Sequence, residues 1–115
     1  MAIFSYGGDL SGQTDGKPIK IMQTASAGAT IHTAIAGTSN WHELFIWAYC
    51  THTAAVTLSI EYGDTDTITQ TLQNLVGPIW IIPKGSPLQN SQVIKIFASV
   101  ANVVYVGGWH NIYTA

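Results

Sequence analysis

The sequence has little charge and contains no arginine. Its basic residues are Lys17, Lys20, Lys84 and Lys95, and charged residues make up 9% of the chain, against about 25% in an average soluble domain. Binding to a phosphate backbone requires clustered lysine and arginine side chains. Four scattered lysines cannot form such a cluster, so we expect no nucleic-acid partner.

Cysteine and long apolar runs are also scarce. The single Cys50 leaves no partner for an internal disulfide, which suits a protein made in a reducing cytoplasm. No run approaches the ~20 apolar residues of a membrane span, so we expect no membrane partner. Residues 1–6 show no basic stretch leading into an apolar one, and we expect no signal peptide.

Threonine, serine, glutamine and asparagine take the place of the missing charges, and two interpretations follow. The chain could be a hydrophilic β-domain whose hydroxyl groups keep the strand faces wet. Alternatively, sister subunits or a larger lattice cover its surface, since interfaces are depleted in charged residues. We favour the second, because low charge and exposed strand edges both promote association.

Period-two alternation of apolar and polar residues indicates β-strands. It is clearest over residues 55–62, where one face would be buried and the other wet. Residues 42–50 are apolar on both faces, which predicts a central strand or one that faces a partner. We expect these two segments to form a hairpin.

Further strands are expected over residues 18–24, 30–34, 65–73, 76–82, 92–100 and 102–113, with the last two as a hairpin. Pro78 cannot donate to a sheet ladder and so marks an edge strand or a strand start. Short strands with frequent turns indicate a sandwich, a jelly roll or a barrel. We predict an all-β, antiparallel two-sheet β-sandwich, jelly-roll-like, over residues 18–115. The Gly-rich residues 1–17 would form an extended N-terminal arm.

The histidines and the cysteine do not show the spacing of a zinc motif. The candidates are His32, His42, His52, His110 and Cys50. His42 and His52 could approach each other across a hairpin, but this set is incomplete. We therefore expect no metal site and no cofactor, and interpret the histidines as partly buried or interfacial.

The acidic residues and the missing hydrolase motifs point away from catalysis. Glu61, Asp64 and Asp66 lie at a turn that could hold calcium, but their spacing is not that of an EF-hand loop, and we favour a solvated turn. Glu43 and Glu61 could be a carboxylate pair, although nothing in their spacing requires it. The chain has no Gly-x-Ser-x-Gly elbow and no phosphate loop. We expect no enzymatic activity.

Aromatic residues are the strongest candidates for function. Tryptophan and tyrosine anchor protein interfaces, and the anchors that we select are Trp41, Trp47, Tyr49, Trp80 and Trp109. The same residues could simply fill the core. They could also form a carbohydrate platform, as in a carbohydrate-binding module or a tail or receptor-binding component. A β-sandwich oligomer with a small-molecule pocket is a third interpretation.

Five segments carry a resemblance to a known group of proteins: residues 5–10 (SYGGDL), 18–20 (PIK), 24–34 (TASAGATIHTA), 88–91 (LQNS) and 98–104 (ASVANVV). In these segments the chain resembles small virion proteins of tailed bacteriophages, of the head decoration (cement) kind. The resemblance runs along nearly the whole chain, although no motif in it is as specific as a catalytic signature.

The resemblance implies a viral structural protein on the outside of a phage capsid, made in the host cytoplasm. Such a protein stabilises the shell by clamping neighbouring subunits of the major capsid protein, often as a trimer or dimer of its own copies. A clamp needs rigid β-structure and a few aromatic anchors more than it needs a pocket. The resemblance assigns no functional residue.

Overall fold

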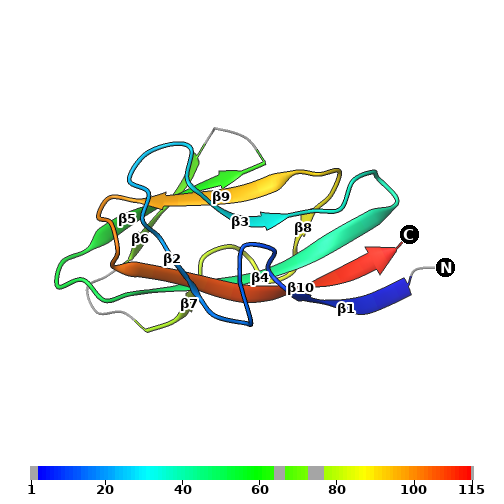
Figure 1. Ribbon diagram of the computed structural model, residues 1–115, viewed down its shortest axis with the longest axis horizontal. Coiled ribbons are helices and arrows are strands. Elements are labelled where there is room, and N and C mark those ends of the chain that lie inside the picture. Colours follow the sequence, from blue (N-terminus) through cyan, green and yellow to red (C-terminus); the bar gives the residue numbers. More distant parts are fainter. Residues whose placement is uncertain (1–2, 64–66, 73–76, 115) are drawn as a thin grey trace.

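The computed structural model describes residues 3–63, 67–72 and 77–114, and within these ranges the chain consists of strands and loops (Figure 1). No helix in the described ranges is long and apolar enough to cross a membrane. The strands are β1 (Ile3–Asp9), β2 (Ile19–Lys20), β3 (Ala29–Thr33), β4 (Asn40–Cys50), β5 (Val56–Tyr62), β6 (Thr67–Leu72), β7 (Ile79–Trp80), β8 (Ser86–Leu88), β9 (Val93–Ala98) and β10 (Val104–Thr114).

One sheet, here called sheet A, is built around the two longest strands. β4 and β10 pair antiparallel in continuous register from Val104↔Cys50 to Thr114↔Asn40. β1 and β2 pair with the other side of β10, and β7 and β8 pair with the other side of β4. Residues 42–50 therefore lie in a central strand, as their apolar character predicts. Pro78 immediately precedes β7, which lies at the edge of the sheet.

The second sheet, sheet B, has the strand order β3-β9-β5-β6 and is also antiparallel. It lies over sheet A, so that the molecule has two layers (Figure 1). The predicted all-β fold with two antiparallel sheets is confirmed. The core between the sheets contains Leu10, Ile21, Ile31, Leu44, Ile46, Ala48, Val56, Leu58, Ile60, Leu72, Ile94, Ile96, Val104 and Val106.

Strand alternation decides which side chains enter this core. Along β4 the even-numbered residues from His42 to Cys50 are buried, while the odd-numbered residues point away from the core. β10 follows the same rule and buries Val104, Val106 and His110. Successive side chains of a strand point to opposite faces, so each central strand supplies both the core and the outer surface of sheet A.

Both predicted hairpins are wrong. β4 lies in sheet A and β5 in sheet B, so the connection over residues 51–55 crosses between sheets. The same holds for β9 and β10. Alternation shows that one face of a strand is buried but does not show whether the next strand pairs beside it or packs opposite it. The crossing segments bond elsewhere: the Thr51 amide donates to the Val103 carbonyl (2.8 Å) and the Asn102 amide to the Ile21 carbonyl (2.9 Å).

The predicted extended N-terminal arm is not confirmed, because residues 3–9 form β1 along β10. Leu10, which follows β1, is fully buried. The loop after it is held by the Gly16 amide, which donates to Asp9 Oδ2 at 2.8 Å, and by the Gln13 amide, which donates to the Leu10 carbonyl at 2.9 Å. This segment therefore belongs to the body of the molecule.

A pair of isoleucine substitutions tests the core. Ile96→Ala should lower the free energy of unfolding by about 2–5 kcal/mol, because it leaves a cavity between the sheets, where Ile96 is 0% exposed. Ile68→Ala is the matched control, since Ile68 is 52% exposed on edge strand β6. It should cost less than about 1 kcal/mol. Urea denaturation measures both, and equal losses would contradict this assignment of the core.

Candidate functional site

The outer surface of sheet A carries a set of aromatic side chains, here called the aromatic face. They come from odd-numbered positions of β4 and β10, which point away from the core, and from edge strand β7. Its members are Phe45, Trp47 and Tyr49 of β4, Trp80 of β7, and Tyr105 and Trp109 of β10.

One half of the aromatic face is a cluster of three rings. Phe45 and Trp109 are direct partners across the β4–β10 ladder, and their rings stack with centroids 4.9 Å apart at 5°. Trp80 stands edge-on to both, at 6.4 Å from Phe45 and 5.7 Å from Trp109. Offset stacks and edge contacts are the favourable aromatic geometries. Lys84 Nζ lies 5.7 Å from the Trp80 ring centroid, within cation–π range.

The other half is a row of stacked rings at the opposite end of the same strands. Trp47 stacks on Tyr49 at 6.0 Å, and Tyr49 stacks on Tyr105 at 5.0 Å. Gly107 makes the position of Trp47 possible, because a Cβ at residue 107 would lie 2.5 Å from the indole ring. The Trp47 ring therefore lies directly over bare backbone of β10. Lys20 Nζ is 5.9 Å from the centroid of Tyr105.

All five anchors selected from the sequence lie in sheet A, and four of them belong to the aromatic face. The fifth, Trp41, is 37% exposed and lies at the far end of β4, where it lines a separate open pocket. The sequence selection missed Phe45 and Tyr105. Phe45, like Trp47 and Tyr49, is an odd-numbered residue of β4, so strand alternation could have placed it on the same face. Tyr105 could be placed there only from the pairing of β10 with β4.

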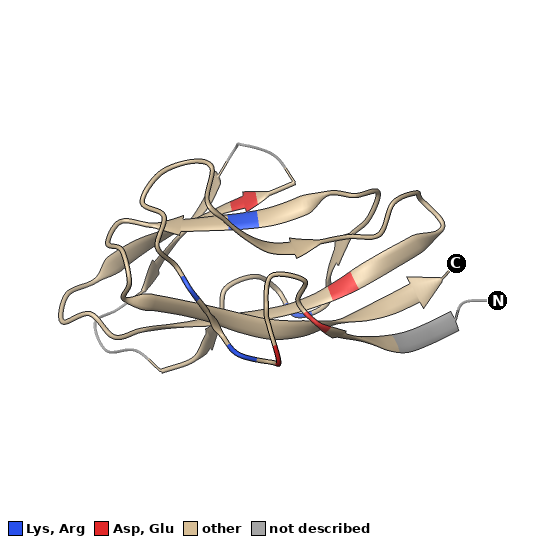
Figure 2. Cartoon of the chain, viewed as in Figure 1, with Lys and Arg blue, Asp and Glu red and all other residues tan. Residues whose placement is uncertain are grey.

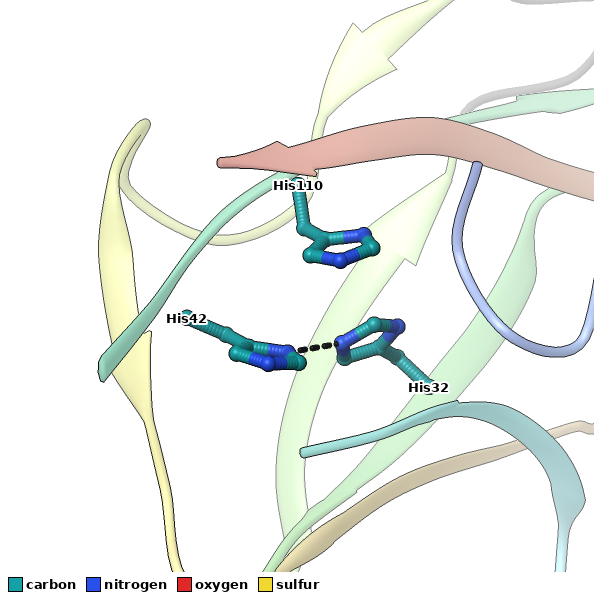
Figure 3. A group of neighbouring side chains, drawn as sticks. All are labelled: His32, His42 and His110. Carbon is teal, nitrogen blue, oxygen red and sulfur yellow. Dashed lines mark hydrogen bonds between the residues drawn. The ribbon is translucent and has the colours of Figure 1, made fainter. Parts of the chain in front are cut away.

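A second feature is a cluster of three buried histidines, His32 of β3, His42 of β4 and His110 of β10 (Figure 3). They are 1%, 5% and 8% exposed, and their ring centroids are 4.5–5.0 Å apart. One nitrogen from each ring lies within 4.8 Å of the other two. His32 belongs to sheet B and the other two to sheet A, so the cluster joins the two layers.

Two β-bulges shape the surroundings of this histidine cluster. The register of β3 shifts between Thr30 and His32, so that Ile31 and His32 are both buried. The register of β1 shifts at Gly7, where a Cβ would lie 2.2 Å from Nε2 of His110. Bulges re-aim side chains, and a glycine at residue 7 leaves room for the His110 ring.

Backbone groups hold each of the three rings. The Ser11 amide donates to Nδ1 of His32 at 3.0 Å, and the Ile35 amide donates to Nε2 of His42 at 3.4 Å. Nδ1 of His110 donates to the Asp9 carbonyl at 3.0 Å. The closest contact inside the cluster joins His32 Nε2 and His42 Nδ1 at 2.7 Å.

Burial keeps these histidines neutral. Desolvation, followed by the neighbouring His110 and His42, lowers the pKa of His32 to about 3. Desolvation and then His110 lower the pKa of His42. Desolvation also lowers the pKa of His110, although the carbonyls of Asp9 and Gly8 oppose the effect. Neutral imidazole is the form that binds transition metals, so the three rings could hold a metal ion.

The sequence spacing missed this cluster, because its members come from strands far apart in the chain. Of the candidates singled out there, His52 lies in the connection after β4 and Cys50 is buried with a free thiol, and neither is part of the cluster. The His42–His52 pairing rested on a hairpin that does not form. The one available signal was that His42 and His110 occupy positions whose side chains face the core, on strands rich in apolar residues.

The carboxylate candidates do not come together. Glu61 is 2% exposed, and its oxygens accept hydrogen bonds from Ser26 Oγ and the Gly28 amide, both at 2.7 Å. The Ser26 bond, then the Gly28 bond, lowers the pKa of Glu61. Asp64 and Asp66, its proposed calcium partners, lie outside the described residues. Glu43 on β4 of sheet A accepts a bond from Asn111 on the neighbouring strand β10 (3.2 Å), whereas Glu61 lies on β5 of sheet B.

The lowered histidine pKa values predict acid sensitivity. Unfolded histidines titrate near 6.5, so below this pH the unfolded chain binds more protons than the folded one and stability falls. We expect the free energy of unfolding of metal-free protein to decrease from pH 6.5 to 5, by up to about 1.4 kcal/mol per pH unit for His32 alone. Urea denaturation in chelator-containing buffer measures this loss. His32→Gln should flatten the slope, with His52→Gln as the control, and a pH-independent parent would contradict the prediction.

The chain was compared with models of protein families, with curated proteins and with solved structures, and none of the three comparisons found a match. The interpretation of the aromatic face and of the histidine cluster therefore depends on their own geometry and chemistry.

Proposed function

We propose that this protein is a structural component of a phage virion that attaches to the outside of the capsid through its aromatic face and stabilises the shell. The observation that carries the proposal is the clustering of six aromatic side chains on one outer sheet surface. Trp80 remains 41% exposed there. Clustered tryptophan and tyrosine residues dominate the energetics of protein interfaces.

The distribution of charge supports attachment to another protein. Figure 2 shows few charged residues, spread over both sheets and the loops between strands. On the aromatic face the nearby cations are Lys20 and Lys84, which lie beside Tyr105 and Trp80. An apolar centre with charge only nearby is the usual anatomy of an interface.

The rigidity of the backing sheet also supports this role. Phe45, Trp47, Tyr49, Tyr105 and Trp109 stand on β4 and β10, which pair along their whole length. Side chains on well-paired strands with stacked neighbours lose little freedom when a partner binds, which reduces the entropic cost of association. A preformed aromatic surface suits a protein whose task is attachment.

The strand pairing is consistent with a jelly roll, which we include in the proposal. The pairs β2–β10, β3–β9, β4–β7 and β5–β6 are nested along the chain, as in a folded ribbon of paired strands. Jelly rolls occur in viral capsid proteins and in lectins. The phage assignment itself depends on the resemblance of the sequence to decoration proteins.

The partners that we propose are the major capsid protein and further copies of this chain, as a dimer or trimer, on the capsid surface of the virion. Many copies repeated over a shell turn modest single contacts into strong overall attachment. The protein would be made in the host cytoplasm before it joins the capsid.

Cosedimentation with phage heads that lack this protein tests the proposal. The parent should bind saturably, with a stoichiometry fixed by the capsid lattice. Trp109→Ala and Trp47→Ala should each weaken binding about 30-fold, which corresponds to a loss of about 2 kcal/mol at an interface hot spot. Phe97→Ala is the matched control, because Phe97 is a partly buried aromatic residue on the outer side of sheet B. Failure of the parent protein to cosediment with the heads would contradict the proposal.

Glycan binding is a second candidate, favoured by the surroundings of Trp41. This ring lines an open pocket of about 440 Å³ together with Tyr62, Gln89, Asn90 and other residues. Gln89 Oε1 is buried and has no hydrogen-bond partner among the described residues. An aromatic ring beside amide groups offers a sugar both stacking and hydrogen bonds.

A glycan array followed by calorimetry with the strongest sugar tests this second function. Trp41→Ala should weaken sugar binding at least about tenfold, equivalent to about 1.4 kcal/mol, because it removes the stacking surface. Trp80→Ala should leave sugar binding intact, since Trp80 does not line this pocket. An array without any signal would rule out the glycan interpretation and leave the capsid proposal unaffected.

A further inference from the structure

The hydrogen bonds around the histidine cluster leave its protons in conflict. A neutral imidazole carries one ring proton, and its other nitrogen accepts. Nδ1 of His32 accepts the Ser11 amide (3.0 Å), which places the proton of His32 on Nε2. Nε2 of His42 accepts the Ile35 amide (3.4 Å), which places the proton of His42 on Nδ1.

The two nitrogens that would carry these protons face each other. His32 Nε2 and His42 Nδ1 are 2.7 Å apart, a distance that accommodates one shared proton and not two. Nδ1 of His110 donates to the Asp9 carbonyl, which leaves Nε2 as the acceptor nitrogen of the third ring. Figure 3 shows the His110 ring lying over the other two, and it stacks on His42 with centroids 4.6 Å apart.

The geometry points to a site for a divalent transition-metal ion, with zinc as the prime example, held by ring nitrogens of His32, His42 and His110. A cation between the rings removes the conflict, because each imidazole then binds the metal through the facing nitrogen and carries its single proton on the other nitrogen. For His32 and His42 this moves the proton to Nδ1 and Nε2, so the Ser11 and Ile35 amides must move away from these atoms when the metal binds.

The distances are compatible with small side-chain adjustments. Zinc–nitrogen bonds of about 2.0–2.1 Å in a tetrahedral arrangement place ligand nitrogens about 3.3 Å apart. The His32–His42 pair at 2.7 Å must open slightly, and His110, which stacks on His42, must approach and turn its Nε2 toward the pair. The starting point is an arrangement in which one nitrogen of each ring lies within 4.8 Å of the other two. The bond from His110 to the Asp9 carbonyl is the outer-shell contact that orients a ligating histidine.

The ligand set defines the class of metal. It contains three imidazoles, and among the described residues no carboxylate or thiol joins the group. Imidazole suits zinc, copper, nickel and cobalt, whereas calcium and magnesium require oxygen ligands. The burial of all three rings indicates a structural ion that joins sheet B to sheet A. This inference is independent of the proposed attachment to a capsid.

Cation binding to the tag-free full chain tests the inference. After removal of metal with a chelator, Co²⁺ should bind saturably at one ion per chain and produce the visible absorption of a nitrogen-ligated, low-coordinate site. Zn²⁺ should displace it and raise the unfolding temperature, whereas Ca²⁺ and Mg²⁺ should do neither. A folded parent without saturable cobalt binding would overturn the inference.

Single substitutions locate the site. His110→Gln should weaken cobalt binding by more than the roughly 10–100-fold that loss of an outer-shell partner costs, and His52→Gln should leave it unchanged. Histidine NMR signals of the unmodified parent provide a second measurement that needs no variant. Zinc should shift three ring systems and leave the fourth in place. Parental affinity in His110→Gln, or a zinc response at His52, would overturn the assignment.

Discussion

The pairing of β4 with β10 is the interaction on which the rest of the molecule depends. The two strands run antiparallel in unbroken register along their full length, and every other strand of sheet A attaches to one of them. Because a strand points its side chains alternately to opposite faces, β4 and β10 supply the core side chains of sheet A on one face and most of the aromatic face on the other. They also supply two of the three clustered histidines.

Large side chains lie against the backbone on both faces of this ladder, and glycines and bulges make room for them. Because Gly107 has no side chain, Trp47 can lie across β10 on the outer face. The absence of a side chain at Gly7 likewise leaves room for the His110 ring on the inner face. The bulge in β3 turns His32 inward beside Ile31. Bulges, and glycines that let a side chain approach the backbone closely, are common beside functional sites, where regular strand pairing is interrupted.

Strand identity could be predicted from the sequence because alternation is a local property. The segments 42–50 and 55–62 were recognisable from their own residues, and so was Pro78 as a sign of an edge strand. Sheet membership could not be predicted, since a crossing between layers and a hairpin leave the same pattern in the flanking strands. The histidine cluster remained hidden for the same reason: His110 reaches His42 only through the pairing of β10, and His32 only through the stacking of the sheets.

The aromatic face also gives the molecule a built-in optical label. The chain has four tryptophans, and all of them lie in sheet A: Trp41 and Trp47 on β4, Trp80 on β7 and Trp109 on β10. Sheet B has none. Intrinsic tryptophan emission therefore reports on one layer of the sandwich only, so a change in emission on mixing with any partner would identify the layer that the partner touches. Stacked rings with centroids 4.9–6.0 Å apart are also close enough to couple electronically. Near-ultraviolet circular dichroism should therefore follow the integrity of this face separately from the unfolding of the backbone.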